Sequence, residues 1–194
     1  GLWTCASKKS QTQCDLASKS IKEAKEALKH MSRRDAAKVK AILSVLGDEG
    51  VKNGVEIAGG AVANDRIAQT HTENGVTTIT INEHIKSISQ LEQSSGASAA
   101  GVIVHEGSHA ADQRTILAGR DPSTPQEHYD TERRAFTAEA QIERALNYPD
   151  AGPVTLQLWD PVWSLLPIRD ALIQQGVTNR AWETSATMQN YTHI

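Results

Sequence analysis

One five-residue pattern constrains this chain more than any other feature, because it places two histidines and a glutamate inside an apolar run. Residues 101–113 read GVIVHEGSHAADQ, with His105, Glu106 and His109 among valine, isoleucine and alanine. Charged groups are seldom found in apolar runs unless something pairs with them. On a helix, the two histidines of this H-E-x-x-H pattern lie one turn apart on the same face. The sequence therefore predicts a buried helix, over residues 97–118, whose two histidines share a partner.

A zinc ion is the partner that this spacing suits. Two neutral imidazoles one helical turn apart can both bind one Zn²⁺ at about 2.0–2.1 Å. Glu106 is turned about 100° from His105 around the helix, so it does not share the ligand position. It can instead take a proton from water at the ion. We therefore expect one Zn²⁺ per chain, with His105 and His109 as ligands and Glu106 as the general base.

A catalytic zinc site usually has three protein ligands, so a third ligand has to come from elsewhere in the chain. The residues TPQE at 124–127 predict a helix start, with Thr124 as the cap, Pro at the first helical position and Glu127 completing a capping box. We expect this helix to run from about residue 125 to 146.

Two glutamates lie on the apolar stripe of that helix, and both need partners. Glu132 follows His109 by 23 residues, across a loop that lets the second helix fold back toward the first. We therefore predict Glu132 as the third zinc ligand. Glu139 is the alternative. It lies roughly 10 Å further along the axis, so one straight helix cannot bring both to the same ion.

The rest of the pattern predicts helices around a small sheet. Residues 15–31 and 33–47 have the spacing of amphipathic helices, and residues 61–85 favour a hairpin with its turn at Asn74-Gly75. Residues 86–96 are expected to form a connection with a short helix, and a last helix is expected within 154–176. We interpret residues 1–14 as a polar lead-in, and the glycine-punctuated region 50–60 stays ambiguous.

Several polar residues near the motif are candidates for supporting roles. Asp112 is placed to hold a ligand histidine through its second ring nitrogen, or else to be an exposed residue of the last helical turn. A peptidase also needs a donor for the oxyanion of its tetrahedral intermediate. The candidates for that donor are His128, Tyr129, Arg134 and Tyr148. The scattered histidines are interpreted as surface or structural residues: His30, His71, His84 and His193.

The motifs HEGSH at 105–109 and ERRA at 132–135 together resemble the gluzincin group of zincin metallopeptidases. In that group H-E-x-x-H is followed by a helix that carries a ligand glutamate, often as E-x-x-A. The resemblance implies that His105, His109 and Glu132 bind the zinc and that Glu106 is the general base. It covers only this part of the chain, and E-x-x-A is common in ordinary helices.

We therefore expect residues 1–194 to form a single metallopeptidase domain of the α+β class. The expected fold is zincin-like, with a small, mainly antiparallel sheet packed on the metal-binding helix and further helices at its sides. The expected activity is zinc-dependent hydrolysis of peptide bonds. The alternatives are a non-catalytic zinc-binding module, whose site would be closed by a fourth ligand such as Asp112 or His128, and an amidase that acts on cell-wall peptides.

Composition restricts the partners. The net charge of −3 gives no electrostatic case for nucleic acid or an anionic membrane, and no apolar run approaches the roughly 20 residues that span a bilayer. The expected partner is a peptide or protein substrate. Cys5 and Cys14 are either a disulfide or two thiols, and the sequence leaves this choice open.

The first residues raise a question of context. The chain opens with Gly1 instead of Met, which is expected of a processed or excised piece. Gly1 and Leu2 resemble the start of the toxin domains that RHS-type polymorphic toxins join after a D-P-x-G-L-type junction. That resemblance implies secretion, or delivery into a target cell as part of a larger polypeptide, with an immunity protein as a partner.

Overall fold

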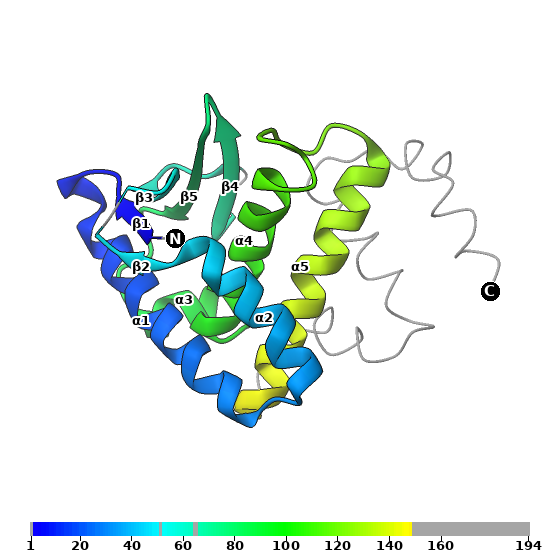
Figure 1. Cartoon of the computed structure of the whole chain (residues 1–194). Helices are drawn as coiled ribbons and strands as arrows, with labels where there is room; N and C mark the ends of the chain where they lie inside the picture. Colours follow the sequence, from blue (N-terminus) through cyan, green and yellow to red (C-terminus); the bar gives the residue numbers. More distant parts are fainter. Residues whose placement is uncertain (1, 51, 64–65, 149–194) are drawn as a thin grey trace.

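The structure is a computed structural model that describes residues 2–50, 52–63 and 66–148, and these form five strands and five α-helices (Figure 1). The strands are β1 (Leu2–Cys5), β2 (Asp48–Glu49), β3 (Val55–Gly60), β4 (Ala68–Glu73) and β5 (Val76–Asn82). The α-helices are α1 (Gln11–Ala27), α2 (Arg33–Leu46), α3 (Ile88–Ser95), α4 (Ala99–Arg114) and α5 (Pro125–Leu146). The expected α+β class is therefore confirmed, whereas the predicted helix within 154–176 lies outside the described residues.

The sheet has the strand order β2-β1-β3-β5-β4. Only the β4–β5 pair is antiparallel, and the other three pairs are parallel. The prediction of a mainly antiparallel sheet is therefore wrong. That prediction rested on the hairpin alone. The parallel strand β3 lies in the region 50–60, where the glycines of the sequence obscure the strand pattern. Parallel strands need a long crossover, and α1 and α2 supply it between β1 and β2.

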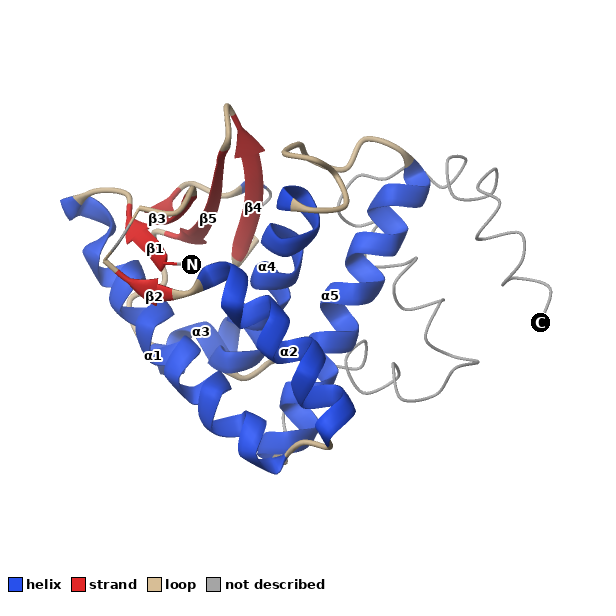
Figure 2. Cartoon of the chain, in the orientation of Figure 1, coloured by secondary structure: helices blue, strands red, loops and turns tan. Residues whose placement is uncertain are grey.

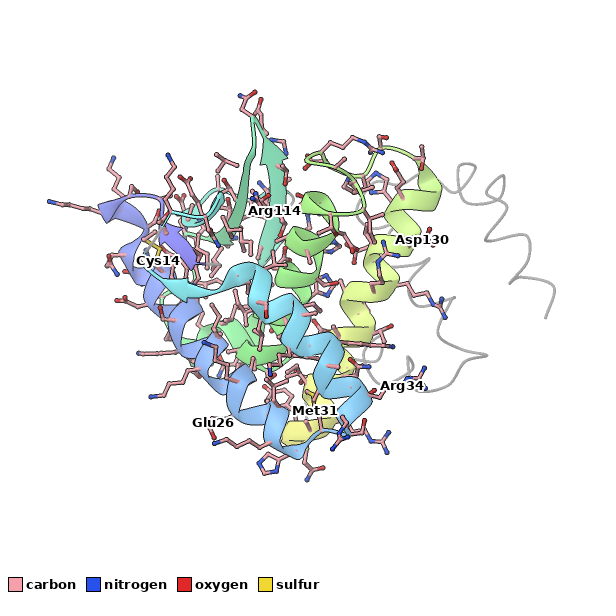
Figure 3. The ribbon with its side chains drawn as sticks, in the orientation of Figure 1. Cys14, Glu26, Met31, Arg34, Arg114 and Asp130 are labelled. Atoms are coloured by element: carbon pink, nitrogen blue, oxygen red, sulfur yellow. A yellow bond between two sulfur atoms is a disulfide. The ribbon has the colours of Figure 1, made fainter. Side chains whose placement is uncertain are left out.

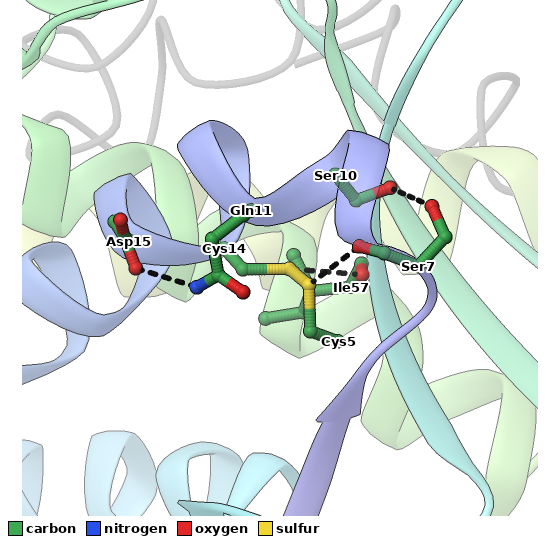
Figure 4. Close-up of a disulfide and its surroundings, with 7 residues drawn as sticks. All are labelled: Cys5, Ser7, Ser10, Gln11, Cys14, Asp15 and Ile57. Atoms are coloured by element: carbon green, nitrogen blue, oxygen red, sulfur yellow. Dashed lines mark hydrogen bonds between the residues drawn. A yellow bond between two sulfur atoms is a disulfide. The ribbon is translucent and has the colours of Figure 1, made fainter.

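The first residues belong to the core of the sheet, so the interpretation of residues 1–14 as a lead-in is also wrong. Strand β1 lies between β2 and β3, and Trp3 is buried there with 1% of its surface exposed. Cys5 at the end of β1 and Cys14 in the second turn of α1 form a disulfide, with their Cα atoms 5.9 Å apart (Figure 4). The bond ties the start of the sheet to the helix that covers it.

Helix α4 is the element around which the others gather. It packs against β4 and β5 on one side and against α1, α2 and α5 on the others (Figures 1 and 2). Val102, Ile103 and Val104 are all buried, although β-branched residues weakly disfavour helices. The burial of almost every side of α4 outweighs this local preference, and the Ser98 side chain caps its first turn by accepting from the Gly101 amide.

The predicted hairpin is confirmed and forms the edge of the sheet nearest α4. Asn74 and Gly75 both have positive φ, as a two-residue turn between twisted strands requires. β5 turns alternate side chains into the core, whereas β4 is the edge strand. Arg114 lies in the last turn of α4 (Figure 3). It donates to the Gly54 and Asn53 carbonyls, which joins the helix to the loop before β3.

Helix α5 begins as the sequence predicts. The Thr124 side chain accepts from the Glu127 amide, the Glu127 side chain reaches back to the cap, and Pro125 is at the first position. The helix packs along α4, and Ala135, which is fully buried, leaves room for the two helices to approach. The α4–α5 contact brings the candidate ligand on α5, Glu132, toward the two histidines on α4.

Candidate metal centre

Three side chains of the H-E-x-x-H pattern lie on α4 where it faces β4 and α5. The Nε2 atoms of His105 and His109 are 3.2 Å apart. Glu106 is buried, with 8% of its surface exposed, as is His109 with 9%. The two imidazoles therefore point the same ring atom at one place, as the one-turn spacing predicts.

Helix α5 brings Glu132 to that place. Glu132 Oε1 lies 2.8 Å from His109 Nε2, and Oε2 lies 3.4 Å from His105 Nε2. One donor atom from each of these three residues lies within 4.8 Å of the others. The three residues predicted as zinc ligands are therefore brought together from two helices.

The donor atoms fit a metal ion. Glu132 Oε2 is buried, and no hydrogen bond of suitable geometry reaches it within the described residues. Two imidazole nitrogens and a carboxylate are a donor set of catalytic zinc sites, and a cation between them would satisfy the unpaired oxygen. The geometry is thus that of a three-ligand site, and a metal would bind most readily when both histidines are neutral.

Without a metal, the buried carboxylate of Glu132 favours the charged form of the histidines beside it. Burial opposes protonation of His105, but the close contact with Glu132 and the negative charge of that carboxylate outweigh it and raise the pKa of His105 to about 9. The pKa of His109 is raised for the same reason. Burial alone would raise the pKa of Glu132, yet His109 and His105 hold it well below its usual range. A metal therefore has to displace protons from this cluster.

Glu139 lies on the other side of the His105 ring. Its Oε1 is 3.5 Å from His105 Nδ1, while Nε2 faces Glu132. Nδ1 makes no hydrogen bond within the described residues, so the contact with Glu139 is one of charge, and a carboxylate on this side favours a proton on Nδ1 and leaves Nε2 for a metal. The Phe136 ring packs edge-on against the same imidazole, with ring centroids 4.6 Å apart. The two glutamates on one helical stripe thus contact opposite nitrogens of one ring.

Strand β4 supplies the wall beside Glu106. The Thr70 hydroxyl donates to Glu106 Oε2 at 2.6 Å, and Gln113 Nε2 donates to the Thr70 carbonyl at 3.1 Å. Between β4 and the helices lies a cleft of about 370 Å³. Its lining combines the three candidate ligands and Glu106 with residues of β4 and of the loop before α5, among them Thr70, His71, Asp121 and His128.

The loop between α4 and α5 closes one end of this cleft. Asp121 Oδ1 accepts from the Thr72 amide at 2.8 Å, and Oδ2 is hydrogen-bonded to His71. These contacts raise the pKa of His71, because the neighbouring carboxylate stabilises its charged form. Asp121 was not among the residues that the sequence singled out. His71 was interpreted as a surface or structural residue, and the side chain of His71 is 53% exposed.

The residues predicted for supporting roles, Asp112 and the candidate oxyanion donors, lie in different parts of the structure. Asp112 is buried, and its Oδ2 accepts from Arg134 Nε at 2.9 Å. Both residues line a second hollow, between α2, α4 and α5, and Tyr148 lines a third. His128 is the oxyanion candidate that lines the cleft of the metal centre. The side chain of Tyr129 is not among those that the structure describes.

The chain matches no family model, no curated protein and no solved structure. Among the described helices, none combines the length and the apolar character that crossing a membrane requires. The function of this chain therefore has to be inferred from the chemistry of its own site.

Proposed function

We propose that this protein is a zinc-dependent metallopeptidase of the zincin type. The observation that carries the proposal is the convergence of His105 Nε2, His109 Nε2 and the Glu132 carboxylate within 4.8 Å, beside the buried Glu106. Three ligands from two helices, with an acidic residue next to them in a cleft, are what metal-assisted hydrolysis requires.

His105, His109 and Glu132 would hold the zinc. When bound, the zinc supplies a Lewis acid that polarises a carbonyl and lowers the pKa of water toward 7. Glu106 takes a proton from the attacking water and passes it to the nitrogen of the leaving amine. Glu139 lies beside Nδ1 of His105, and its negative charge favours the tautomer that presents Nε2. His128 is the cleft residue that is placed to donate to the oxyanion.

The edge position of β4 favours an extended peptide as the substrate. An edge strand has backbone groups that a second chain can pair with. On β4 the Thr70 carbonyl and the Thr72 amide are already bonded to Gln113 and Asp121. The backbone at Ala68, which lines the cleft, is a part of this edge with which a substrate strand can pair.

A non-catalytic zinc module is less well supported. Such a site would be closed by a fourth protein ligand. Within the described part of the chain the metal-binding group consists of three residues, and Asp112 is engaged by Arg134. A structural site would also have no use for Glu106.

The toxin-domain context remains a proposal beside the enzymatic one. The Cys5–Cys14 disulfide is consistent with secretion, because disulfides persist in oxidising compartments. An immunity protein would then be a partner of this chain.

The test of the proposed function is hydrolysis of defined substrates. Purified protein would be loaded with Zn²⁺ and incubated with labelled casein, a quenched fluorescent peptide library and cell-wall muropeptides. We expect peptide-bond cleavage that a chelator abolishes and added Zn²⁺ restores. Cleavage confined to muropeptides would move the proposal to the amidase alternative. Absence of cleavage of every substrate by zinc-loaded protein would overturn the proposal of an enzyme.

A further inference from the structure

We propose that Thr70 is a positioning residue for Glu106. Its hydroxyl holds Oε2 of the carboxylate and leaves Oε1 for proton transfer. The inference rests on the proposed function, because it assigns a purpose to an orientation that only a general base needs. The starting observation is the 2.6 Å hydrogen bond between Thr70 Oγ1 and Glu106 Oε2.

The direction of this hydrogen bond follows from its chemistry. An ionised carboxylate only accepts, so the Thr70 hydroxyl is the donor. The same hydroxyl lies 3.3 Å from the Glu106 backbone carbonyl, but the carboxylate contact is much shorter and is the stronger kind. Within the described residues, no other hydrogen-bond donor contacts the Glu106 carboxylate. The orientation of this side chain therefore depends on one hydroxyl.

Thr70 is itself held in place from two sides. Its carbonyl accepts from Gln113 Nε2, which projects from α4 about two turns after Glu106. On its other side β4 is paired with β5, with Thr70 opposite Ile79. The helix that carries Glu106 thus also anchors the strand that carries its donor, so the two move as one unit.

This rigidity matters because proton transfer has a short range. A general base has to lie within about 2.6–3.2 Å of the atom that gives up the proton. A misplacement of about 1 Å can cost about 100-fold in rate. Glu106 lines the same cleft as His105 and His109, and within the described residues the Thr70 hydroxyl is the donor that fixes its carboxylate there.

Thr72 provides a matched control on the same strand. It lies two residues further along β4 on the same face, and it is buried. Its hydroxyl is hydrogen-bonded to Gln113 Oε1 and to Thr77 Oγ1, both at 2.7 Å. Thr72→Val therefore removes a hydroxyl that does not contact Glu106 but bonds the same Gln113 side chain that anchors the Thr70 carbonyl. It separates the effect of loosening that anchor from the effect of losing the Thr70 hydroxyl.

The first readout needs neither metal nor substrate. Crystal structures of the metal-free protein would be compared for the wild type, Thr70→Val, Thr70→Ser and Thr72→Val. We expect Glu106 Oε2 on the residue-70 hydroxyl in the wild type, Thr70→Ser and Thr72→Val, and a different Glu106 side-chain conformation in Thr70→Val. An unchanged Glu106 conformation in Thr70→Val would overturn the proposal. If Thr70→Val does not fold, Thr70→Ala is read by the same criterion.

The second readout is kinetic, on whichever peptide the wild type cleaves. For Thr70→Val we expect kcat to fall by up to about 100-fold, with KM and zinc content unchanged. Thr70→Ser keeps the hydroxyl, so its kcat should be close to that of the wild type. Thr72→Val, which keeps the Thr70 hydroxyl, should lower the melting temperature and lower kcat far less than Thr70→Val does. Wild-type kcat in Thr70→Val, or an equal loss in Thr70→Ser, would overturn the positioning role. A zinc-loaded wild type that cleaves nothing would instead overturn the proposed function.

Discussion

His109 Nε2 and Glu132 Oε1 lie 2.8 Å apart, although the two residues come from different helices and are separated by a loop. The contact depends on where α5 begins. The capping box at Thr124 and Glu127 fixes its first turn, and Asp121 fixes the preceding loop on β4. Glu132 then faces the H-E-x-x-H histidines about two turns into the helix. Moving the start of α5 by one residue would turn Glu132 about 100° away.

The two glutamates of α5 are expected to respond differently to substitution. Glu132→Ala removes a proposed ligand, so zinc affinity and hydrolysis should be lost together. Glu139→Ala removes the partner of His105 Nδ1, so zinc should be retained with an affinity about 10–100-fold weaker. Titration of each variant with Zn²⁺ by calorimetry measures both effects. Loss of zinc only in Glu139→Ala would transfer the ligand assignment to Glu139.

The metal-free protein should lose stability as the pH rises through the alkaline range. The folded pKa of His105, about 9, lies above its ordinary value of 6.5. Its stabilising contribution is therefore fully present below about pH 6.5 and is lost as the pH rises toward 9. Glu132, whose folded pKa is lowered, contributes above its ordinary pKa and loses that contribution in acid. The melting temperature of chelator-treated protein at each pH measures this.

Glu132→Gln serves as the control for that pH dependence. Without the negative charge of Glu132 the His105 pKa should return toward its ordinary value, so the loss of stability between pH 6.5 and 9 should shrink. Zinc should reverse the trend in the wild type, since deprotonation of the histidines favours metal binding. An identical alkaline decline in the wild type and Glu132→Gln would show that this cluster does not cause it.

Reduction of the disulfide should destabilise the sheet without touching the metal centre. A loop that closes over about ten residues stabilises a protein by about 2–3 kcal/mol in the chain-entropy model. The Cys5→Ser, Cys14→Ser double variant should lose about this much free energy of unfolding in urea, and zinc affinity should stay as in the wild type. A double variant of unchanged stability would mean that β1 is held to α1 by packing alone.

The parts of the fold that sequence predicts are those whose signals are local. The capping box at Thr124, the Asn74-Gly75 turn and the H-E-x-x-H spacing each depend on a few adjacent residues, and the structure has all three features. Strands β1 and β3 were missed because parallel pairing joins segments far apart in the chain. A short strand such as Leu2–Cys5 has no periodicity of its own to reveal it.

The sequence predicts the three residues that the structure brings together as a candidate metal site, but not the residues that support them. Glu132 and Glu139 were found because carboxylates on an apolar stripe need partners. Thr70 carries no such signal, because its contact with Glu106 crosses from the hairpin to the helix. The strand predicted before the Asn74-Gly75 turn does place Thr70 and Thr72 on one face, because side chains two residues apart in a strand point to the same side. Asp121 depends on a loop conformation that no pattern in the sequence describes.

The most direct test of the central claim is a paired measurement of zinc content and peptide hydrolysis in the same samples of wild type, Glu106→Gln, His105→Ala and His109→Ala. We predict one zinc per chain and chelator-sensitive hydrolysis in the wild type. We predict unchanged zinc with hydrolysis lowered by about 10²–10⁴-fold in Glu106→Gln, and loss of both in the two histidine variants. Full hydrolysis by Glu106→Gln, or wild-type zinc content in both histidine variants, would contradict the account.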